Sequence, residues 1–124
     1  MLLFKKKFIE LIRRGEKTQT VRIWPYRKYR EGQRSYIPGI GYIQILAVDA
    51  IPLQDLTEAD AELDGFATRA ALLEEIERLY PAGLANGQQS YRVRFRVLDA
   101  TEQAAAKEEK AARKRAAGQG PGES

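Results

Sequence analysis

The feature that most constrains the fold is residues 15–22, with the sequence GEKTQTVR. Just before it, apolar residues recur at helical spacing over residues 8–12, which predicts a helix of about two turns. Gly15 suits the left-handed residue past a helix end because it has no Cβ to clash there. The Thr, Val and Ile residues that follow favour a strand over residues 17–24. The segment therefore predicts a helix, a turn and a strand that presents a lysine, two threonines and an arginine.

Alternation along that strand bears on any site it carries. Regular pleating places Val21 and Ile23 on one face and Thr20 and Arg22 on the other. It also places Lys17 and Thr20 on opposite faces of the strand. For Lys17 and Thr20 to serve one site, Lys17 has to precede the regular strand or lie beside a bulge.

Other local signals predict the remaining elements. Thr57-Glu58-Ala59-Asp60 resembles a capping box that opens a short helix, and Thr68 suits the N-cap of a second. Apolar residues fall on both faces of one later strand, which predicts that it is central and buried on both sides. The further predicted strands cover residues 2–4, 34–38, 42–51 and 89–98.

Composition changes abruptly near the C-terminal end. Residues 1–99 can bury a core and are predicted to form one domain. Residues 100–124 contain no apolar side chain larger than alanine. Because they have no apolar stripe that could pack on the domain, they are predicted to form a charged, Ala-rich flexible tail, disordered over residues 118–124.

The residue types present exclude several kinds of chemistry. The chain contains no cysteine and no histidine, so we expect no disulfide, no metal site and no cofactor. There is no apolar run of 18 residues, which argues against a membrane span. The charges of residues 5–7 follow the first apolar residues, the wrong order for a secretion signal. We expect a cytoplasmic monomer.

Charge is distributed unevenly along the chain. Residues 1–36 hold 11 Lys and Arg against 3 Asp and Glu, a net charge of +8. Residues 37–98 hold 5 against 9, a net charge of −4. This asymmetry predicts a face adapted to an anion such as RNA, although an uneven solvated surface would give the same count.

Several motifs, taken in order, resemble the ASCH domain family. They are Gly-x-Lys-Thr-x-Thr-x-Arg at residues 15–22, Leu56-Thr57-Glu58, Asp64-Gly65-Phe66, Tyr80-Pro81 and a closing strand through Phe95. ASCH domains are small PUA-like β-barrel proteins linked to RNA. The resemblance implies an α+β fold: a PUA-like curved mixed or antiparallel β-barrel of five or six strands with two or three helices.

The resemblance also implies candidate catalytic residues. Related ASCH proteins include small amidohydrolases that remove the acetyl group from N4-acetylcytidine. Their catalytic positions carry over to Lys17, Thr20 and Asp64, where Asp64 replaces a glutamate. A lysine base needs a pKa lowered by about three units, which burial and Arg22 favour and Asp64 opposes. Alternatively, Lys17 is a phosphate-binding cation and Asp64 ends a helix.

A second set of residues favours nucleic-acid binding. The set combines cations, which contact phosphates, with aromatic side chains, which stack on unpaired bases. An alternative to base stacking is that Trp24 and Tyr36 cover one end of the barrel. The row of Arg92, Arg94 and Arg96 is interpreted as a solvated face. The candidate binding residues are Lys17, Arg22, Trp24, Tyr26, Arg27, Lys28, Arg30 and Arg34.

The sequence thus favours an RNA- or nucleotide-binding ASCH module as the first choice. The alternative is a metal-free amidohydrolase acting on N4-acetylcytidine or a related acylated nucleoside, so whether the chain is an enzyme stays open. Geometry distinguishes the two. An enclosed Lys17 with Asp64 in reach favours the hydrolase, whereas an open basic surface favours binding.

Overall fold

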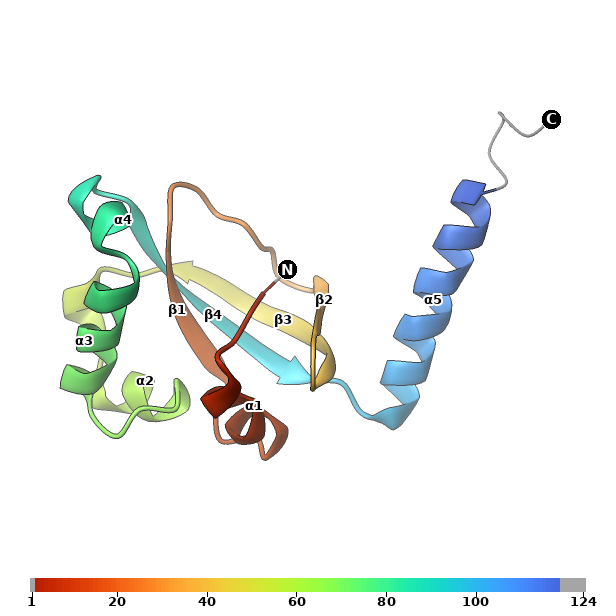
Figure 1. Ribbon diagram of the computed structural model, residues 1–124, viewed down its shortest axis with the longest axis horizontal. Helices are drawn as coiled ribbons and strands as arrows, with labels where there is room; N and C mark the ends of the chain where they lie inside the picture. Colours follow the sequence, from red (N-terminus) through yellow and green to blue (C-terminus); the bar gives the residue numbers. More distant parts are fainter. Residues whose placement is uncertain (1, 119–124) are drawn as a thin grey trace.

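A computed structural model describes residues 2–118. Within this range the chain forms a curled, four-stranded antiparallel half-barrel sheet and five α-helices (Figure 1). The strand order is β1-β4-β3-β2. The strands are β1 (Gln19–Trp24), β2 (Arg34–Ile37), β3 (Gly41–Ala50) and β4 (Gln89–Val97). The helices are α1 (Lys6–Arg13), α2 (Glu58–Leu63), α3 (Arg69–Leu79), α4 (Pro81–Ala85) and α5 (Ala100–Gly118), with a 3₁₀ turn at Leu53–Asp55.

The α+β class and the curved antiparallel sheet are confirmed, but the predicted strand count of five or six is wrong. Residues 2–4 do not join the sheet. Leu2 is buried in the core instead, and the carbonyl of Leu3 accepts a hydrogen bond from the Arg22 guanidinium at 2.7 Å. This segment is therefore held by side chains rather than by a backbone ladder.

The predicted helix count of two or three is also too low. Pro81 ends α3, as expected, but it also occupies the first turn of α4. Proline tolerates that position because the first N–H groups of a helix have no intrahelical acceptor. Residues 100–118 add α5.

A bulge in β3 contributes to the bend of the sheet. Ile45 pairs with Phe95, and the register then shifts so that Ala47 pairs with Arg94. Leu46 is 45% exposed, and Val48 returns to the buried face. The prediction that this strand is buried on both faces is wrong, because the extra residue reverses the alternation.

Two hydrophobic clusters cover opposite faces of β1. On one face Trp24 packs in a cluster that includes Phe8 and Ile12 of α1. On the other face Val21 and Ile23 pack against α2 and α3. Strand β1 is therefore buried on both sides, and the start of this strand lies between the helices.

Helix α5 is attached to the sheet through its first two turns. The side chain of Gln103 donates to the carbonyl of Tyr42 and accepts from its N–H, both at 2.8 Å. Ala106 is buried, and the later turns project away from the domain (Figure 1). Flexibility of residues 100–124 stays a prediction. Of the residues predicted to be disordered, all but Gly118 lie outside the described range.

A capping box opens α5. Asp99 accepts a hydrogen bond from the N–H of Glu102, and Glu102 accepts one from the N–H of Asp99. The hydrogen bond from Arg96, followed by the one from the Asp99 backbone, lowers the pKa of Glu102 to about 2.

Among residues 2–118, no helix has the combined length and apolar character needed to cross a bilayer.

Candidate functional site

A cavity of about 340 Å³ lies between the N-terminal segment with α1 on one side and α3 on the other. Much of its wall is apolar or aromatic and includes Phe4, Phe8, Phe66, Ile76 and Tyr80. The start of β1 and the turn after α2 supply polar side chains. The charged and polar residues that line it are Lys5, Lys17, Thr20, Arg22, Asp64 and Glu75.

The end of α1 positions Lys17. The N–H of Glu16 donates to the carbonyl of Leu11 at 2.9 Å, and Gly15 donates to Ile12 at 3.1 Å with a φ of 76°. This pair of bonds is the Schellman motif, which requires a left-handed residue that glycine supplies. The chain then turns sharply, so Lys17 precedes the regular strand rather than lying within its alternation.

The end of α2 positions Asp64 in the same way. Gly65 donates to Glu62 at 3.0 Å and Phe66 donates to Ala61 at 2.8 Å. The two turns are joined by a hydrogen bond of 2.9 Å from the N–H of Thr18 to the carbonyl of Leu63. Two helix ends therefore meet at the floor of the cavity.

Lys17 and Asp64 form a buried ion pair. The Lys17 side chain is 2% exposed, and its ammonium donates to both the carboxylate Oδ1 and the backbone carbonyl of Asp64. The other carboxylate oxygen, Oδ2, accepts from the N–H of Val21 at 3.1 Å. Asp64 thus has both oxygens satisfied, and the shorter side chain reaches the lysine.

Two aromatic rings complete the surroundings of the ammonium. Lys17 Nζ lies 4.6 Å from the ring centroid of Phe8 and 5.7 Å from that of Phe4. Such contacts stabilise a cation within about 6 Å of a ring face. The helical spacing of Phe8 marked it only as a core residue, because periodicity does not distinguish a core position from a cavity wall.

Burial shifts the pKa values of Lys17 and Asp64 toward each other. Desolvation lowers the pKa of Lys17, against the attraction and hydrogen bond of Asp64, and Arg22 lowers it further. Desolvation likewise raises the pKa of Asp64, against the opposing effects of Lys17 and Val21. A neutral amine beside a protonated carboxyl is therefore less unfavourable here than in water.

Thr20 and Arg22 line the same cavity, although among the described residues the Lys17 ammonium is hydrogen-bonded to Asp64 and not to the Thr20 hydroxyl. The Thr20 hydroxyl is buried and accepts a hydrogen bond from Arg22 Nε at 3.0 Å. The Arg22 guanidinium also lies 5.0 Å from the Phe4 ring centroid. The hydroxyl retains its own proton for donation, and a fixed positive charge lies next to its oxygen.

Glu75 of α3 also lines the cavity, and sequence reasoning missed it. Its carboxylate pairs with Lys5 at 2.7 Å, and this hydrogen bond is the main cause of its lowered pKa. No local signal distinguishes Glu75 from the other charged residues of α3. Only the packing of α3 beside the N-terminal segment brings it to the cavity.

This chain resembles known proteins in structure rather than in sequence. No protein-family model matches the sequence, and no curated protein matches it. Among solved structures, an ASCH domain from Lactobacillus crispatus JV V101 is 18% identical, with a TM-score of 0.57 over 72% of this chain and 69% of that one. The chain has the ASCH-like fold.

Two other solved structures share this fold. The DUF984 protein EF3133 from Enterococcus faecalis V583 is 21% identical, with a TM-score of 0.60 over 75% of this chain and 71% of that one. The hypothetical protein PH0355 is 14% identical, with a TM-score of 0.66 over 77% of this chain and 95% of that one.

The predicted nucleic-acid-binding residues lie at three separate concave surfaces of the ASCH-like domain. Lys17 and Arg22 line the cavity. Arg22 also borders a separate depression, lined further by Trp24, Tyr26, Arg27 and Lys28. Arg30 and Arg34 line a groove beside α5. In the depression Trp24 is largely buried against Tyr29 and Tyr91, whereas Tyr26 is 66% exposed.

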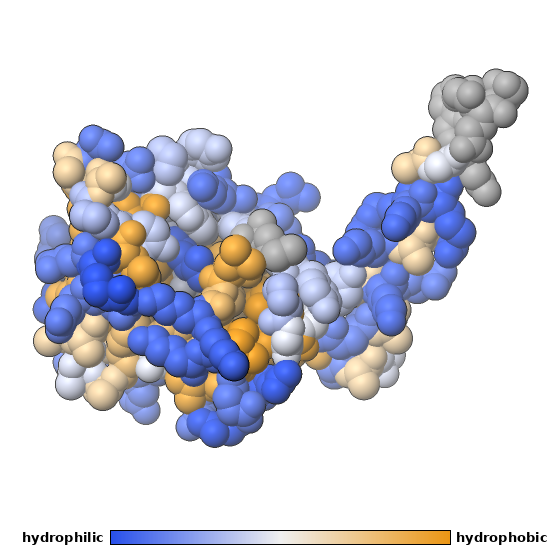
Figure 2. Space-filling model, viewed as in Figure 1, coloured by the Kyte–Doolittle hydropathy of each residue, from blue (hydrophilic) through white to orange (hydrophobic). Residues whose placement is uncertain are grey.

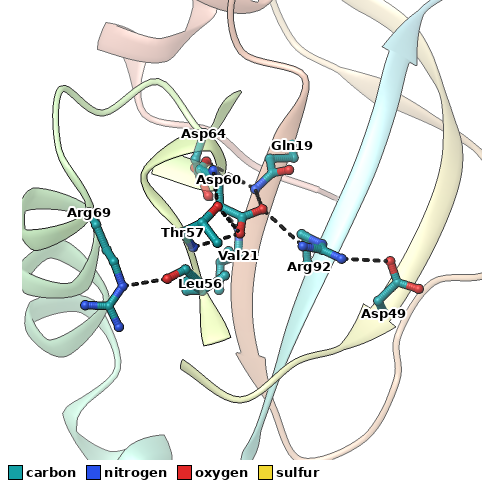
Figure 3. A network of polar contacts seen from close by, with 9 residues as sticks. All are labelled: Gln19, Val21, Asp49, Leu56, Thr57, Asp60, Asp64, Arg69 and Arg92. Carbon is teal, nitrogen blue, oxygen red and sulfur yellow. Dashed lines mark hydrogen bonds and ion pairs between the residues drawn. The ribbon is translucent and has the colours of Figure 1, made fainter. Parts of the chain in front are cut away.

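A second polar network braces β1 against α2 and β4 (Figure 3). The carboxylate of Asp60 accepts hydrogen bonds from Gln19 at 3.2 Å, from Arg92 at 3.1 Å and from the Thr57 N–H at 2.9 Å. Arg92 also reaches Asp49, its partner across β3 and β4, at 3.7 Å. Within the row of arginines on β4, Arg92 thus has acidic partners on both sides.

Gly65 supports a prediction about how the ASCH-like domain holds Asp64 in place. Its φ is +88°, and an added Cβ would lie 3.2 Å from Leu11 and 3.3 Å from Phe8. Gly65→Ala is therefore expected to lower the free energy of unfolding by about 2 kcal/mol, from backbone strain plus crowding. Urea denaturation measures the change.

Gly87→Ala is the matched control. Gly87 has a φ of +69°, and its Cβ would meet no atom within 4 Å. We expect a loss of only about 1 kcal/mol, from the left-handed backbone alone. Equal losses at the two positions would contradict a tight packing of the Asp64 turn against α1.

Proposed function

We propose that this protein hydrolyses the amide bond of a small acylated nucleobase or nucleoside, with N4-acetylcytidine as the representative substrate. The observation that carries the proposal is the enclosed Lys17–Asp64 pair at the floor of a cavity that Thr20 also lines. An open basic surface around Lys17 would have favoured a binding module. The enclosed arrangement favours the hydrolase, which the sequence alone ranked second.

Residues of the cavity take the nucleophilic and proton-transfer roles of amide hydrolysis in this proposal. Lys17, as a neutral amine, takes the proton of the Thr20 hydroxyl while the Thr20 oxygen bonds to the acyl carbon. Arg22, which already donates a hydrogen bond to the Thr20 oxygen, stabilises the negative charge on that oxygen as its proton leaves. The C–N bond then breaks, and the departing amine receives a proton from the Lys17–Asp64 pair. Water repeats the attack on the resulting ester and releases the acid.

The dimensions and lining of the cavity support a substrate of this size. Its volume of about 340 Å³ lies at the lower end of the range for small-molecule sites. Phe4, Phe8, Phe66 and Tyr80 line it and offer apolar faces to a planar base. A longer nucleic-acid strand would have to present one base to the cavity.

The central experiment follows release of cytidine from N4-acetylcytidine by the parent protein, Thr20→Val and Thr20→Ser. Valine keeps the shape of threonine but removes its hydroxyl, so we expect a loss of at least about 100-fold in kcat/KM. Serine keeps the hydroxyl and is expected to stay within about tenfold. Absence of cytidine release by the folded parent, or full activity of Thr20→Val, would contradict the proposal.

The pH dependence of hydrolysis follows from the lowered pKa of Lys17. The base is active only when neutral, so kcat/KM is expected to rise with pH through that lowered pKa. The midpoint of the rise should lie below pH 10.5, the ordinary value for lysine. A midpoint at or above pH 10.5 would show that Lys17 is not the base.

A binding module for RNA or nucleotides is the second candidate. The depression lined by Tyr26, Arg27 and Lys28 favours it, because it combines an exposed aromatic ring with cations. Arg27→Ala/Lys28→Ala is expected to weaken RNA binding by this surface and to leave cytidine release unchanged. The two candidate functions thus have separate variants.

A further inference from the structure

A second, strongly basic groove lies between α5 and the β2–β3 hairpin, away from the cavity. It has a volume of about 800 Å³. Figure 2 shows the hollow between the body of the domain and the projecting helix, with hydrophilic residues along it. The groove exists because Gln103 and Ala106 pack the start of α5 against the sheet, whereas its later turns diverge from the sheet.

One face of α5 is directed into this groove. Ala106, Glu109, Lys110, Arg113 and Lys114 all line it, and their spacing of three and four residues places them on one side of a helix. In most surface helices such a stripe is apolar and packs on the core. Here the stripe after Ala106 holds one carboxylate and three cations, so it is too polar to pack on a core.

The opposite wall is also cationic. Arg30 and Arg34 line it, and Arg34 pairs across the groove with Glu109 at 2.9 Å. Among residues 2–118, the groove therefore collects five cations against one carboxylate. Like charges that face one another across a groove repel, and a bound anion removes that repulsion.

An exposed tyrosine and its partly buried neighbour indicate which kind of anion the groove binds. Tyr36 is 44% exposed, and its ring meets Tyr42 edge-on with centroids 5.2 Å apart. Lys110 Nζ lies 6.0 Å from the Tyr36 ring centroid. A cation over a partly exposed ring is suited to contact a phosphate while the adjoining base stacks on that ring.

We propose that this groove binds single-stranded nucleic acid, with the phosphates along Arg30, Lys110 and Arg113 and a base on Tyr36. Aromatic rings favour a nucleic acid over an acidic peptide, which would need only the charges. The site is independent of the proposed hydrolysis in the cavity. It also differs from the depression beside Tyr26, although both surfaces are basic.

The test uses the full chain and a fluorescein-labelled 12-nucleotide oligouridine, followed by fluorescence anisotropy at several salt concentrations. Lys110→Ala/Arg113→Ala is expected to weaken binding about tenfold at low salt. The slope of log K against log salt should decrease by about 1.4, since each phosphate contact on a single strand contributes about 0.7. Tyr36→Ala is expected to weaken binding of the oligonucleotide but not of inorganic polyphosphate.

Lys107→Ala/Arg115→Ala is the matched control, because it removes two cations from α5 that do not line the groove. We expect less than a twofold change in affinity. Equal losses in the two α5 variants would overturn the proposal and indicate non-specific attraction. It would equally be overturned if only Arg27→Ala/Lys28→Ala weakened binding, or if poly-glutamate bound as tightly as the oligonucleotide. Release of cytidine from N4-acetylcytidine serves as a separate readout and is expected to be unchanged.

Discussion

Replacing Lys17 with methionine is expected to abolish release of cytidine from N4-acetylcytidine and to lower the free energy of unfolding by about 3 kcal/mol. Methionine retains much of the length of lysine, so the change mainly removes the ammonium. The carboxylate and carbonyl of Asp64 would then remain buried without that donor. Urea denaturation measures the stability, and the cytidine assay measures the activity.

A double-mutant cycle separates the ion pair from the rest of the site. In Lys17→Met/Asp64→Asn neither charge is buried alone, and the asparagine oxygen can still accept from Val21. We expect the loss of stability to be smaller than the sum of the single losses by about 1–3 kcal/mol, with no recovery of activity. Strictly additive losses would contradict the pairing. Lys6→Met, at an exposed position of α1, is the control and is expected to change stability by less than about 0.5 kcal/mol.

Replacing Asp60 with alanine is expected to lower the free energy of unfolding by about 3 kcal/mol. Asp60 does not line the cavity, so the change leaves the lining residues in place. The change removes the capping box of α2 and leaves Gln19 and Arg92 without their shared acceptor. Desolvation raises the pKa of Asp60, but the hydrogen bonds from Thr57, Gln19 and Arg92 outweigh it and the pKa is lowered. The stabilisation is therefore present above pH 3.8 and is lost as the pH falls through the lowered pKa.

Asp49→Ala provides the comparison for Asp60→Ala. Asp49 also pairs with Arg92, but its side chain is 48% exposed and the distance is 3.7 Å. Exposed pairs of this kind contribute at most about 1 kcal/mol, so we expect a small loss. If the two aspartates contributed equally, the Asp60 network would not brace β1 against α2.

Local signals in the sequence were sufficient for most secondary structure. The left-handed Gly15, the capping box at Thr57 and the N-cap at Thr68 all form as predicted. Their causes act over a few residues: the absence of a Cβ, or a side-chain oxygen near unpaired N–H groups. Such local causes do not depend on how the rest of the chain packs.

The arrangement of the site required tertiary structure. Lys17 and Asp64 are 47 residues apart, and only a family resemblance suggested that they act together. No local pattern indicated the bulge at Leu46, the Glu75 carboxylate at the cavity or the groove beside α5. Each depends on how helices and strands pack across the chain. A side chain's burial and partners, and so its pKa, are set by residues that are distant in sequence.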